Sequence, residues 1–181
     1  MKKLSLIFSF IIISTSISAE NEISLKNLEN LAKQGNLAAQ IELAKSYRKG
    51  IRVTQDYKTA VKWFTLAAKQ GDAVSQYNLG IMHSFGLGVV PNYRHGVKWY
   101  TLAAEQGHAL AQYNLGRLYY LGKGLHENLI YAHMWAKQAS SNGFKMSTEF
   151  KDMLTELMTE NQIEKANRLR INCVIKKYKG C

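Results

Sequence analysis

The chain has 181 residues, of which 46% are apolar, 20% charged and 10% aromatic, and it contains one proline. This composition supports one hydrophobic core and excludes collagen, a coiled coil, a small disulfide framework and an unfolded chain. The 24 Lys and Arg residues outnumber the 13 Asp and Glu residues and give a formal net charge of +11. Such a charge fits a nucleic acid or an anionic surface only if it is spread over one face of the fold.

Residues 1–19 have the layout of a secretory signal peptide. Lys2 and Lys3 give a positive start, residues 4–13 are mostly apolar, and residues 14–19 are mostly small and polar. The apolar run is shorter than the roughly 20 residues that span a bilayer, so an uncleaved anchor helix is the weaker alternative. We therefore expect a periplasmic or secreted protein with no transmembrane segment after signal removal.

Residues 20–146 contain a repeat with a period of 36 residues. The residues shared at that offset are Trp63, Trp99 and Trp135; Gln40, Gln76 and Gln112; Leu43, Leu79 and Leu115; Gly50, Gly86 and Gly122; and Gly71, Gly107 and Gly143. The period predicts a half repeat at about 25–38 and full repeats at about 39–74, 75–110 and 111–146.

Each repeat is predicted to form two helices. In the first helix, buried-type residues recur at the i, i+3, i+4, i+7 spacing of one helix face. In the first repeat these are Gln40, Leu43, Ala44 and Tyr47. The second helix is apolar around most of its girth, so it should lie between neighbours. Asp56, Asn92 and Asn128 precede the second helices and are predicted N-caps. The repeated glycines should end both helices in the left-handed conformation.

The order of these residues resembles the Sel1-like repeat family, a relative of the tetratricopeptide arrays. The second repeat carries the pattern most fully, in Leu79-Gly80, Gly86-Leu87-Gly88, Asn92, Trp99, Ala103-Ala104 and Gly107. Arg52 departs from the pattern, because it replaces the second glycine of the Gly-x-Gly turn. The resemblance implies an all-α fold, a right-handed α/α solenoid, and a scaffold that binds proteins or peptides and needs no cofactor. The closing stretch also resembles exported Sel1-repeat proteins of Gram-negative bacteria.

The third repeat differs most from the others. His133, Ala136 and Gln138 stand where the first repeat has Val61, Phe64 and Leu66. We attribute this loss of apolar bulk to the end of the stack, where a repeat lacks a full neighbour.

Residues 147–181 are predicted to form C-terminal capping helices and a basic tail. Phe150, Met153, Leu154 and Leu157 make one apolar face, and residues 159–162 have the form of a capping box. Six Lys and Arg residues follow Glu164 with no acidic residue among them, so much of the positive charge lies in the tail. A nucleic-acid partner is therefore not expected, while an anionic envelope surface and simple solvation of the tail both remain open.

Cys173 and Cys181 are the only cysteines. An even pair near one terminus in an oxidising compartment predicts one disulfide.

The sequence contains no recognised catalytic or metal-binding motif. It has no Gly-x-Ser-x-Gly nucleophile motif and no phosphate loop, and the position four after His126 is Ile130, so zinc-ligand spacing is missing. We expect neither an enzyme nor a metal site. The alternative that stays open is a cell-envelope enzyme or a peptidoglycan- or β-lactam-binding protein, a role associated with cysteine-rich relatives.

A binding groove is better supported, because variable large residues share one stripe on the first helices. The predicted groove residues are Tyr77, Ile81, Ser84, Tyr113, Arg117 and Tyr120, with Ile41, Lys45 and Arg48 on the first repeat. First helices line the concave side of the related tetratricopeptide arrays, and Tyr and Arg often dominate contact energies at interfaces. Alternatively, the tyrosines pack between repeats.

Overall fold

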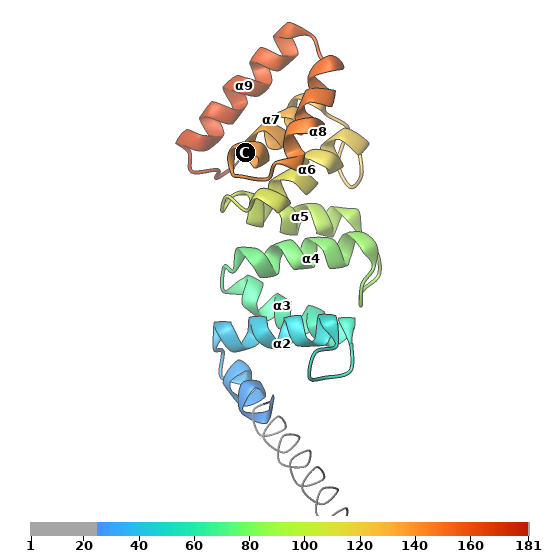
Figure 1. Cartoon of the computed structure of the whole chain (residues 1–181), viewed down its shortest axis with the longest axis vertical. Coiled ribbons are helices and arrows are strands. Elements are labelled where there is room, and N and C mark those ends of the chain that lie inside the picture. The colour runs from blue at the N-terminus through green and yellow to red at the C-terminus, as the bar shows by residue number, and fades with distance from the viewer. Residues whose placement is uncertain (1–24, 181) are drawn as a thin grey trace, which may run out of the picture.

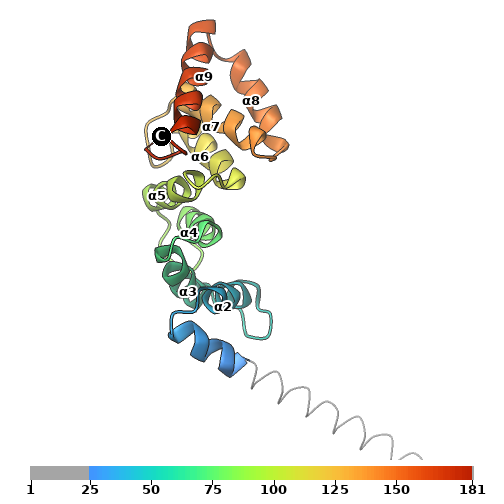
Figure 2. The same ribbon diagram turned by 90° about the vertical axis from the view of Figure 1, so that its left-hand side faces the viewer.

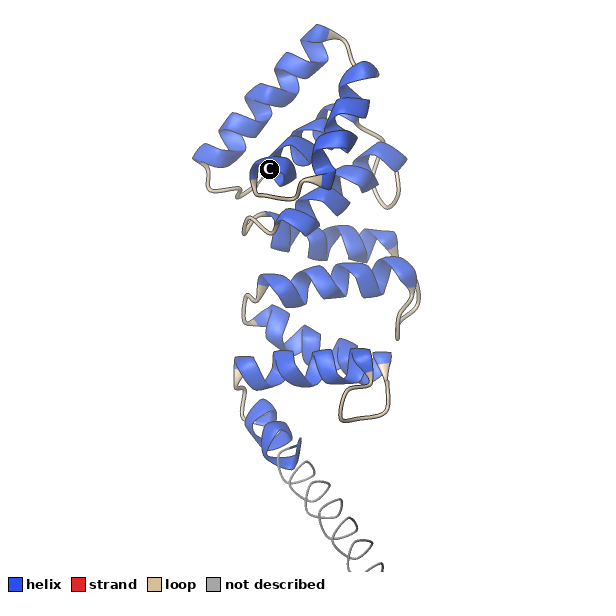
Figure 3. Ribbon diagram, in the orientation of Figure 1, coloured by secondary structure: helices blue, strands red, loops and turns tan. Residues whose placement is uncertain are grey.

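The computed structural model describes residues 25–180, so the predicted signal peptide and Cys181 lie outside the described residues. The described part is made of helices joined by short loops, and none of its residues forms a strand (Figure 1, Figure 3). After a helical segment at 25–33, the helices are α2 (Leu37–Lys49), α3 (Tyr57–Lys69), α4 (Ala73–Phe85), α5 (Tyr93–Ala104), α6 (Ala109–Leu121), α7 (Leu129–Ser141), α8 (Met146–Glu156) and α9 (Glu160–Ile175).

The helices stack along one long axis and form an α/α solenoid (Figure 1). The first helices of the repeats are α2, α4 and α6, and the second helices are α3, α5 and α7. Figure 2 shows α2 and α4 on one side of the stack and α3 and α5 on the other. Each helix from α2 to α7 packs against the next helix in the chain, and α9 packs against α7. The predicted all-α fold and solenoid architecture are confirmed.

The predicted helix ends are also confirmed. Side-chain oxygens of Asp56, Asn92 and Asn128 accept hydrogen bonds from backbone N–H groups in the first turns of α3, α5 and α7. Gly50, Gly86 and Gly122 have left-handed φ angles of 69°, 72° and 61° at the ends of α2, α4 and α6. The caps of these first helices are Asn36, Asp72 and His108, which were not predicted.

The second glycine of the Gly-x-Gly turn touches the preceding repeat. A Cβ added at Gly88, where φ is +74°, would overlap the backbone of Tyr57 at the start of α3. A Cβ at Gly124 would lie 2.6 Å from the carbonyl carbon of Tyr93 at the start of α5. Arg52 occupies the corresponding place in the first repeat with φ of 64° and an exposed side chain. The turn therefore keeps its left-handed geometry even where the glycine is replaced.

A buried glutamine on each first helix joins three successive helices of the stack. The Nε2 atoms of Gln40, Gln76 and Gln112 donate to the carbonyls of Ala32, Ala68 and Ala104 at 3.0, 3.2 and 3.0 Å. Their Oε1 atoms accept from Gln70, Gln106 and Asn142 at 2.8, 2.7 and 2.9 Å. Each glutamine on a first helix thus bonds the ends of the second helices before and after it. Buried amides need such partners, which explains why glutamine recurs every 36 residues.

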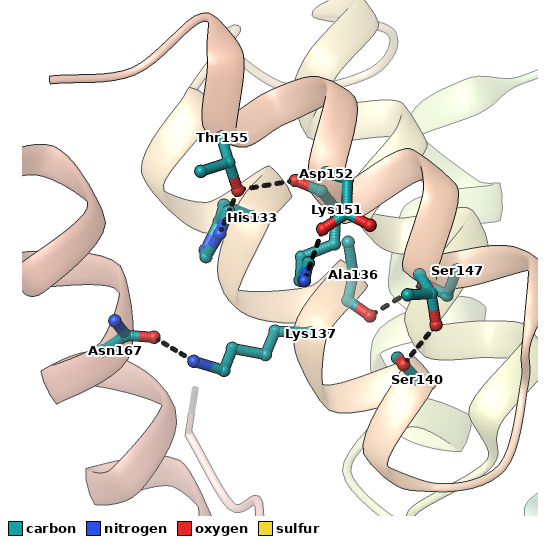
Figure 4. Close-up of polar contacts among 10 residues, drawn as sticks. His133, Ala136, Lys137, Ser140, Ser147, Lys151, Asp152, Thr155 and Asn167 are labelled. Atoms are coloured by element: carbon teal, nitrogen blue, oxygen red, sulfur yellow. Dashed lines mark hydrogen bonds and ion pairs between the residues drawn. The ribbon is translucent and has the colours of Figure 1, made fainter. Parts of the chain in front are cut away.

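Helices α8 and α9 enclose α7. Ser147 on α8 donates a 2.7 Å hydrogen bond to the carbonyl of Ala136, and Lys137 donates a 2.7 Å bond to Asn167 on α9 (Figure 4). The side chains of His133, Ala136 and Gln138 are 2%, 0% and 3% exposed. In the described part of the chain, the third repeat has no further repeat beside it and is covered by α8 and α9 instead. The smaller and more polar residues there leave room for α8 and α9.

The apolar face of α8 is narrower than predicted. Leu154 is fully buried and Phe150 is half-buried, but Met153 and Leu157 are 38% and 56% exposed. Met158 is buried instead, in the turn after α8. The helix ends at Glu156, so the spacing that predicted Leu157 as a core residue no longer applies there.

The tail after α9 folds back onto the repeats. The N–H of Thr159 donates to Oε1 of Gln162 at 2.9 Å, which confirms the capping box at the start of α9. Beyond α9, the hydroxyl of Tyr178 accepts a 3.0 Å hydrogen bond from Nε2 of Gln138. The three lysines of the tail, Lys176, Lys177 and Lys179, remain exposed.

Candidate binding groove

The six predicted groove residues lie on α4 and α6. Tyr77, Ile81 and Ser84 belong to α4, and Tyr113, Arg117 and Tyr120 belong to α6. Ser84 is buried, Arg117 is exposed, and the other four are half-buried. This surface is thus partly packed within the protein.

Tyr77 and Tyr113, which are 36 residues apart, each contact an aromatic ring 31 residues later in the chain. The ring of Tyr77 stacks on His108 with centroids 4.6 Å apart, and the ring of Tyr113 meets Phe144 edge-on at 4.9 Å. His108 and Phe144 are themselves 36 residues apart and lie at or just before the start of the next helix. Both tyrosines are therefore packed partly against residues at the end of their own repeat.

Helix α8 covers part of the stripe on α6. The ring of Phe150 lies 5.6 Å from that of Tyr113 and 5.9 Å from that of Tyr120. Arg117 lies between these tyrosines in the sequence and stays exposed, with its guanidinium carbon 5.8 Å from the centroid of Tyr113. Of the three groove residues on α6, Arg117 is the one most available to a partner.

A hollow of about 100 Å³ lies beside Arg117 and Ser84. It is lined by Ser84, Phe85, Tyr93, Tyr100, Asn114, Arg117, Leu118, Leu121 and Lys123. Of these residues, only Ser84 and Arg117 were predicted from the sequence. The others come from α4, α5, α6 and the turn after α6, at positions that do not share one helical stripe, so periodicity could not reveal them.

Close packing of α4 against α5 forms one wall of the hollow. A Cβ added at Gly80 would lie 2.5 Å from ring carbons of Tyr100, and one at Gly96 would overlap the hydroxyl of Ser84. The two glycines therefore let Tyr100 and Ser84 sit between the helices. The Ser84 Oγ atom is buried beside the Tyr100 hydroxyl, its polar neighbour across the α4–α5 contact. It offers a polar group to any ligand that enters the hollow.

The charged residues at the hollow are both basic. Arg117 and Lys123 line it without any Asp or Glu, and neither forms an ion pair with another described residue. The ammonium of Lys123 lies 5.3 Å from the ring centroid of Tyr93. Burial raises the pKa of the Tyr100 hydroxyl, which stays protonated and able to donate a hydrogen bond. This combination suits a carboxylate or a backbone carbonyl.

His133 is buried and His83 is half-buried within the fold. Burial, with smaller contributions from Lys137 and Lys151, lowers the pKa of His133 to about 4, and its Nε2 lies 3.1 Å from Oγ1 of Thr155 (Figure 4). Burial and the neighbouring His95, whose ring centroid is 5.4 Å away, lower the pKa of His83. Between residues 25 and 180, no group of three or more His, Cys, Asp or Glu side chains could hold a metal ion.

The structure describes one of the two cysteines of the predicted disulfide. Cys173 is buried on α9, and its Sγ lies 3.8 Å from Sδ of Met134, whereas Cys181 lies outside the described residues. The pairing stays a prediction. Across the described part of the chain, no helix has both the length and the apolar character needed to cross a bilayer.

Comparison with known families and structures gives one consistent result. The sequence model of the family described as Sel1 repeat matches residues 37–72, 73–108 and 109–144. These are three contiguous matches with the predicted period, each beginning two residues before the predicted boundary. No curated protein matches the chain.

Two solved structures share the fold. The Sel1 repeat protein from Oxalobacter formigenes is 31% identical over 76% of this chain, with a TM-score of 0.65. A protective antigen of uropathogenic Escherichia coli strains, which displays an SLR fold, is 29% identical over 85% of this chain, with a TM-score of 0.66. The chain spans 59% and 41% of the lengths of these two proteins.

Proposed function

The chain belongs to the Sel1 repeat family, and on this premise we propose that it is an exported scaffold that binds a protein or peptide along its first helices. Proteins of this family generally mediate protein–protein interactions. Repeat arrays of this kind present an extended surface whose specificity depends on the residues that vary between repeats.

The hollow beside Ser84 and Arg117 carries the proposal. It combines the buried hydroxyls of Ser84 and Tyr100, an exposed guanidinium and an aromatic wall around about 100 Å³. A few precisely placed polar groups in an apolar setting are typical of ligand sites. The volume suits one side chain or one chain end of a partner, and not a large cofactor.

The charge along the first helices defines the partner further. On the predicted stripe, Lys45, Arg48 and Arg117 are basic, and Lys123 adds a fourth positive charge beside the hollow. A segment with one or more carboxylates would therefore be drawn to this side by long-range attraction. We propose that the partner inserts a carboxylate between Arg117 and Lys123.

Export remains part of the proposal. The layout of residues 1–19 supports it, and a disulfide between Cys173 and Cys181 would fit an oxidising compartment. Gly180, the residue before Cys181, lines the same small hollow as Cys173, so the chain end returns close to α9. The exposed lysines of the tail leave open an additional contact with an anionic envelope surface.

The experiment is chemical cross-linking in cells that produce the full chain, followed by identification of the captured proteins by mass spectrometry. The test variant combines Arg117→Ala and Lys123→Ala, because these side chains line the hollow without serving the core. Tyr113→Ala is less suitable, since Tyr113 also packs on Phe144 and Phe150.

A matched control combines Lys165→Ala and Arg168→Ala, which removes two positive charges from exposed positions on α9. We expect a defined partner that the wild type and the control capture and the test variant loses. Equal capture by all three proteins would overturn the groove assignment. Loss from the control alone would move the binding site to the C-terminal region.

A further inference from the structure

A second hollow lies on the opposite side of the solenoid from the first helices. It has a volume of about 390 Å³ and is lined by His95, Lys98, Trp99 and Leu102. These residues have the i, i+3, i+4, i+7 spacing of a single face of α5. Trp99 is half-buried and Leu102 is 43% exposed, so an apolar strip on α5 faces outward.

The third repeat shows what can cover this face. The residues that correspond to the α5 strip 36 positions later are on α7. They are Tyr131, Met134, Trp135 and Gln138. There α9 packs on the strip: Cys173 Sγ lies 3.8 Å from Met134 Sδ, and Arg170 donates to Gln138 at 3.4 Å. The outer face of a second helix in this protein can thus pack against another helix.

The strip on α7 is mostly buried, whereas the strip on α5 is more exposed and carries a lysine. Met134 and Trp135 are each 1% exposed beneath α9. In α5 their counterparts are Lys98, which is exposed, and Trp99, which is half-buried. A lysine in place of the methionine keeps the uncovered strip hydrated while leaving the tryptophan in place for a partner.

The charges on α5 and on the preceding second helix, α3, are all positive. These helices carry Lys58, Lys62, Lys69, Arg94 and Lys98 and contain no Asp or Glu. The corresponding hollow on α3, about 370 Å³ around Trp63, is bordered by Glu29 as well as by Lys33 and Lys62. The hollow on α5 has no acidic residue in its lining, so it is the one that favours an anionic partner.

The geometry points to a docking site on α5 for an acidic amphipathic helix of a partner protein. Its apolar side would pack on Trp99 and Leu102 as α9 packs on α7, and a carboxylate on its edge would pair with Lys98. This site lies apart from the groove of the first helices and does not depend on that groove having a ligand.

Two other occupants fit less well. The α9 helix of a second copy carries Lys165, Arg168 and Arg170 against Glu160 and Glu164, so its net charge has the same sign as that of α5. An anionic membrane would meet the lysines but would leave the hollow beside Trp99 unfilled. A helix satisfies both the charge and the shape.

The test uses two synthetic 16-residue peptides and the full chain. Both peptides keep apolar residues at the positions of Ile163, Ala166, Leu169 and Cys173 of α9, with alanine replacing the cysteine. One peptide carries glutamates beside this face and the other carries lysines at the same positions. Binding is followed by the fluorescence anisotropy of the labelled peptide at low and moderate salt, because screening weakens attraction between exposed charges.

The protein variants are Lys98→Glu and its counterpart in the preceding repeat, Lys62→Glu. We expect saturable binding of the glutamate peptide that weakens in moderate salt. The affinity should fall by about tenfold or more in Lys98→Glu and change by less than about twofold in Lys62→Glu. The Arg117→Ala, Lys123→Ala variant should still bind, which separates this site from the groove.

Three results would overturn the inference. They are an absence of saturable binding, equal binding of the glutamate and lysine peptides, and equal loss in the two charge-reversal variants. Anionic vesicles are tested in parallel. Lys98-dependent binding to vesicles without binding to the glutamate peptide would assign the face to a membrane instead.

Discussion

Gln106 donates a 2.7 Å hydrogen bond from Nε2 to Oε1 of Gln76, linking the end of α5 to α4. Gln76 also donates to the carbonyl of Ala68 at the end of α3. One buried side chain on α4 therefore connects the second helices on both sides of it. Since the same arrangement recurs at Gln40 and Gln112, the glutamines hold the spacing between repeats.

Gln76→Ala should destabilise the protein by about 1–3 kcal/mol, because it removes the two hydrogen bonds that the buried Gln76 amide makes to the Ala68 carbonyl and to Gln106. Urea denaturation followed by circular dichroism measures the loss. Gln34→Ala is the control, since Gln34 is an exposed glutamine just after the helical segment at 25–33. If the two variants unfold at the same urea concentration, the Gln76 hydrogen bonds do not contribute to stability.

The glycine of the repeat turn gives a second test. Gly35 and Gly88 have φ angles of +92° and +74°, so alanine is strained at both positions by about 1–2 kcal/mol. A Cβ at Gly35 meets no atom within 4 Å, whereas one at Gly88 would overlap the backbone of Tyr57. Gly88→Ala should therefore lower the melting temperature clearly more than Gly35→Ala. Equal melting temperatures would show that contact between repeats at this turn is unimportant.

The repeat and its helix ends could be predicted from the sequence because they depend on local chemistry. A side-chain cap such as Asn92 and a left-handed glycine such as Gly86 act within a few residues of the chain. The 36-residue period then carried each assignment from one repeat to the next. The same reasoning could not reveal the contact of Tyr113 with Phe150, because that contact depends on α8, where the period has stopped.

The remaining features depend on contacts between segments that no sequence pattern relates. The hollow beside Arg117 gathers residues from α4, α5, α6 and a turn. The seat of α9 on α7 joins Met134 to Cys173, 39 residues apart and outside any shared period. In such cases the sequence supplies suitable residues, but only the folded chain shows which of them meet.

The predicted disulfide between Cys173 and Cys181 can be tested by alkylation and intact-mass spectrometry. Protein taken from its native compartment is denatured and alkylated without a reductant, and we expect neither thiol to be modified. After reduction, both should react. Cys181→Ser should leave Cys173 open to alkylation under denaturing conditions and serves as the control. Alkylation of both thiols in the unreduced wild type would contradict the pairing.

His133 should make stability depend on pH below neutrality. Burial lowers its pKa to about 4 in the folded protein, against an ordinary value near 6.5, so protons bind the unfolded chain more readily. Its contribution is fully present above pH 6.5 and is lost as the pH falls towards 4. We expect the free energy of unfolding to drop by roughly 1–2 kcal/mol between pH 7 and pH 5 on its account. Urea titrations of His133→Gln should show a smaller drop, with the remaining slope due partly to His83 and His108, whose pKa values burial also lowers. His126→Gln, at an exposed loop position, should behave like the wild type, and an unchanged slope in His133→Gln would mean that His133 is not protonated more easily on unfolding.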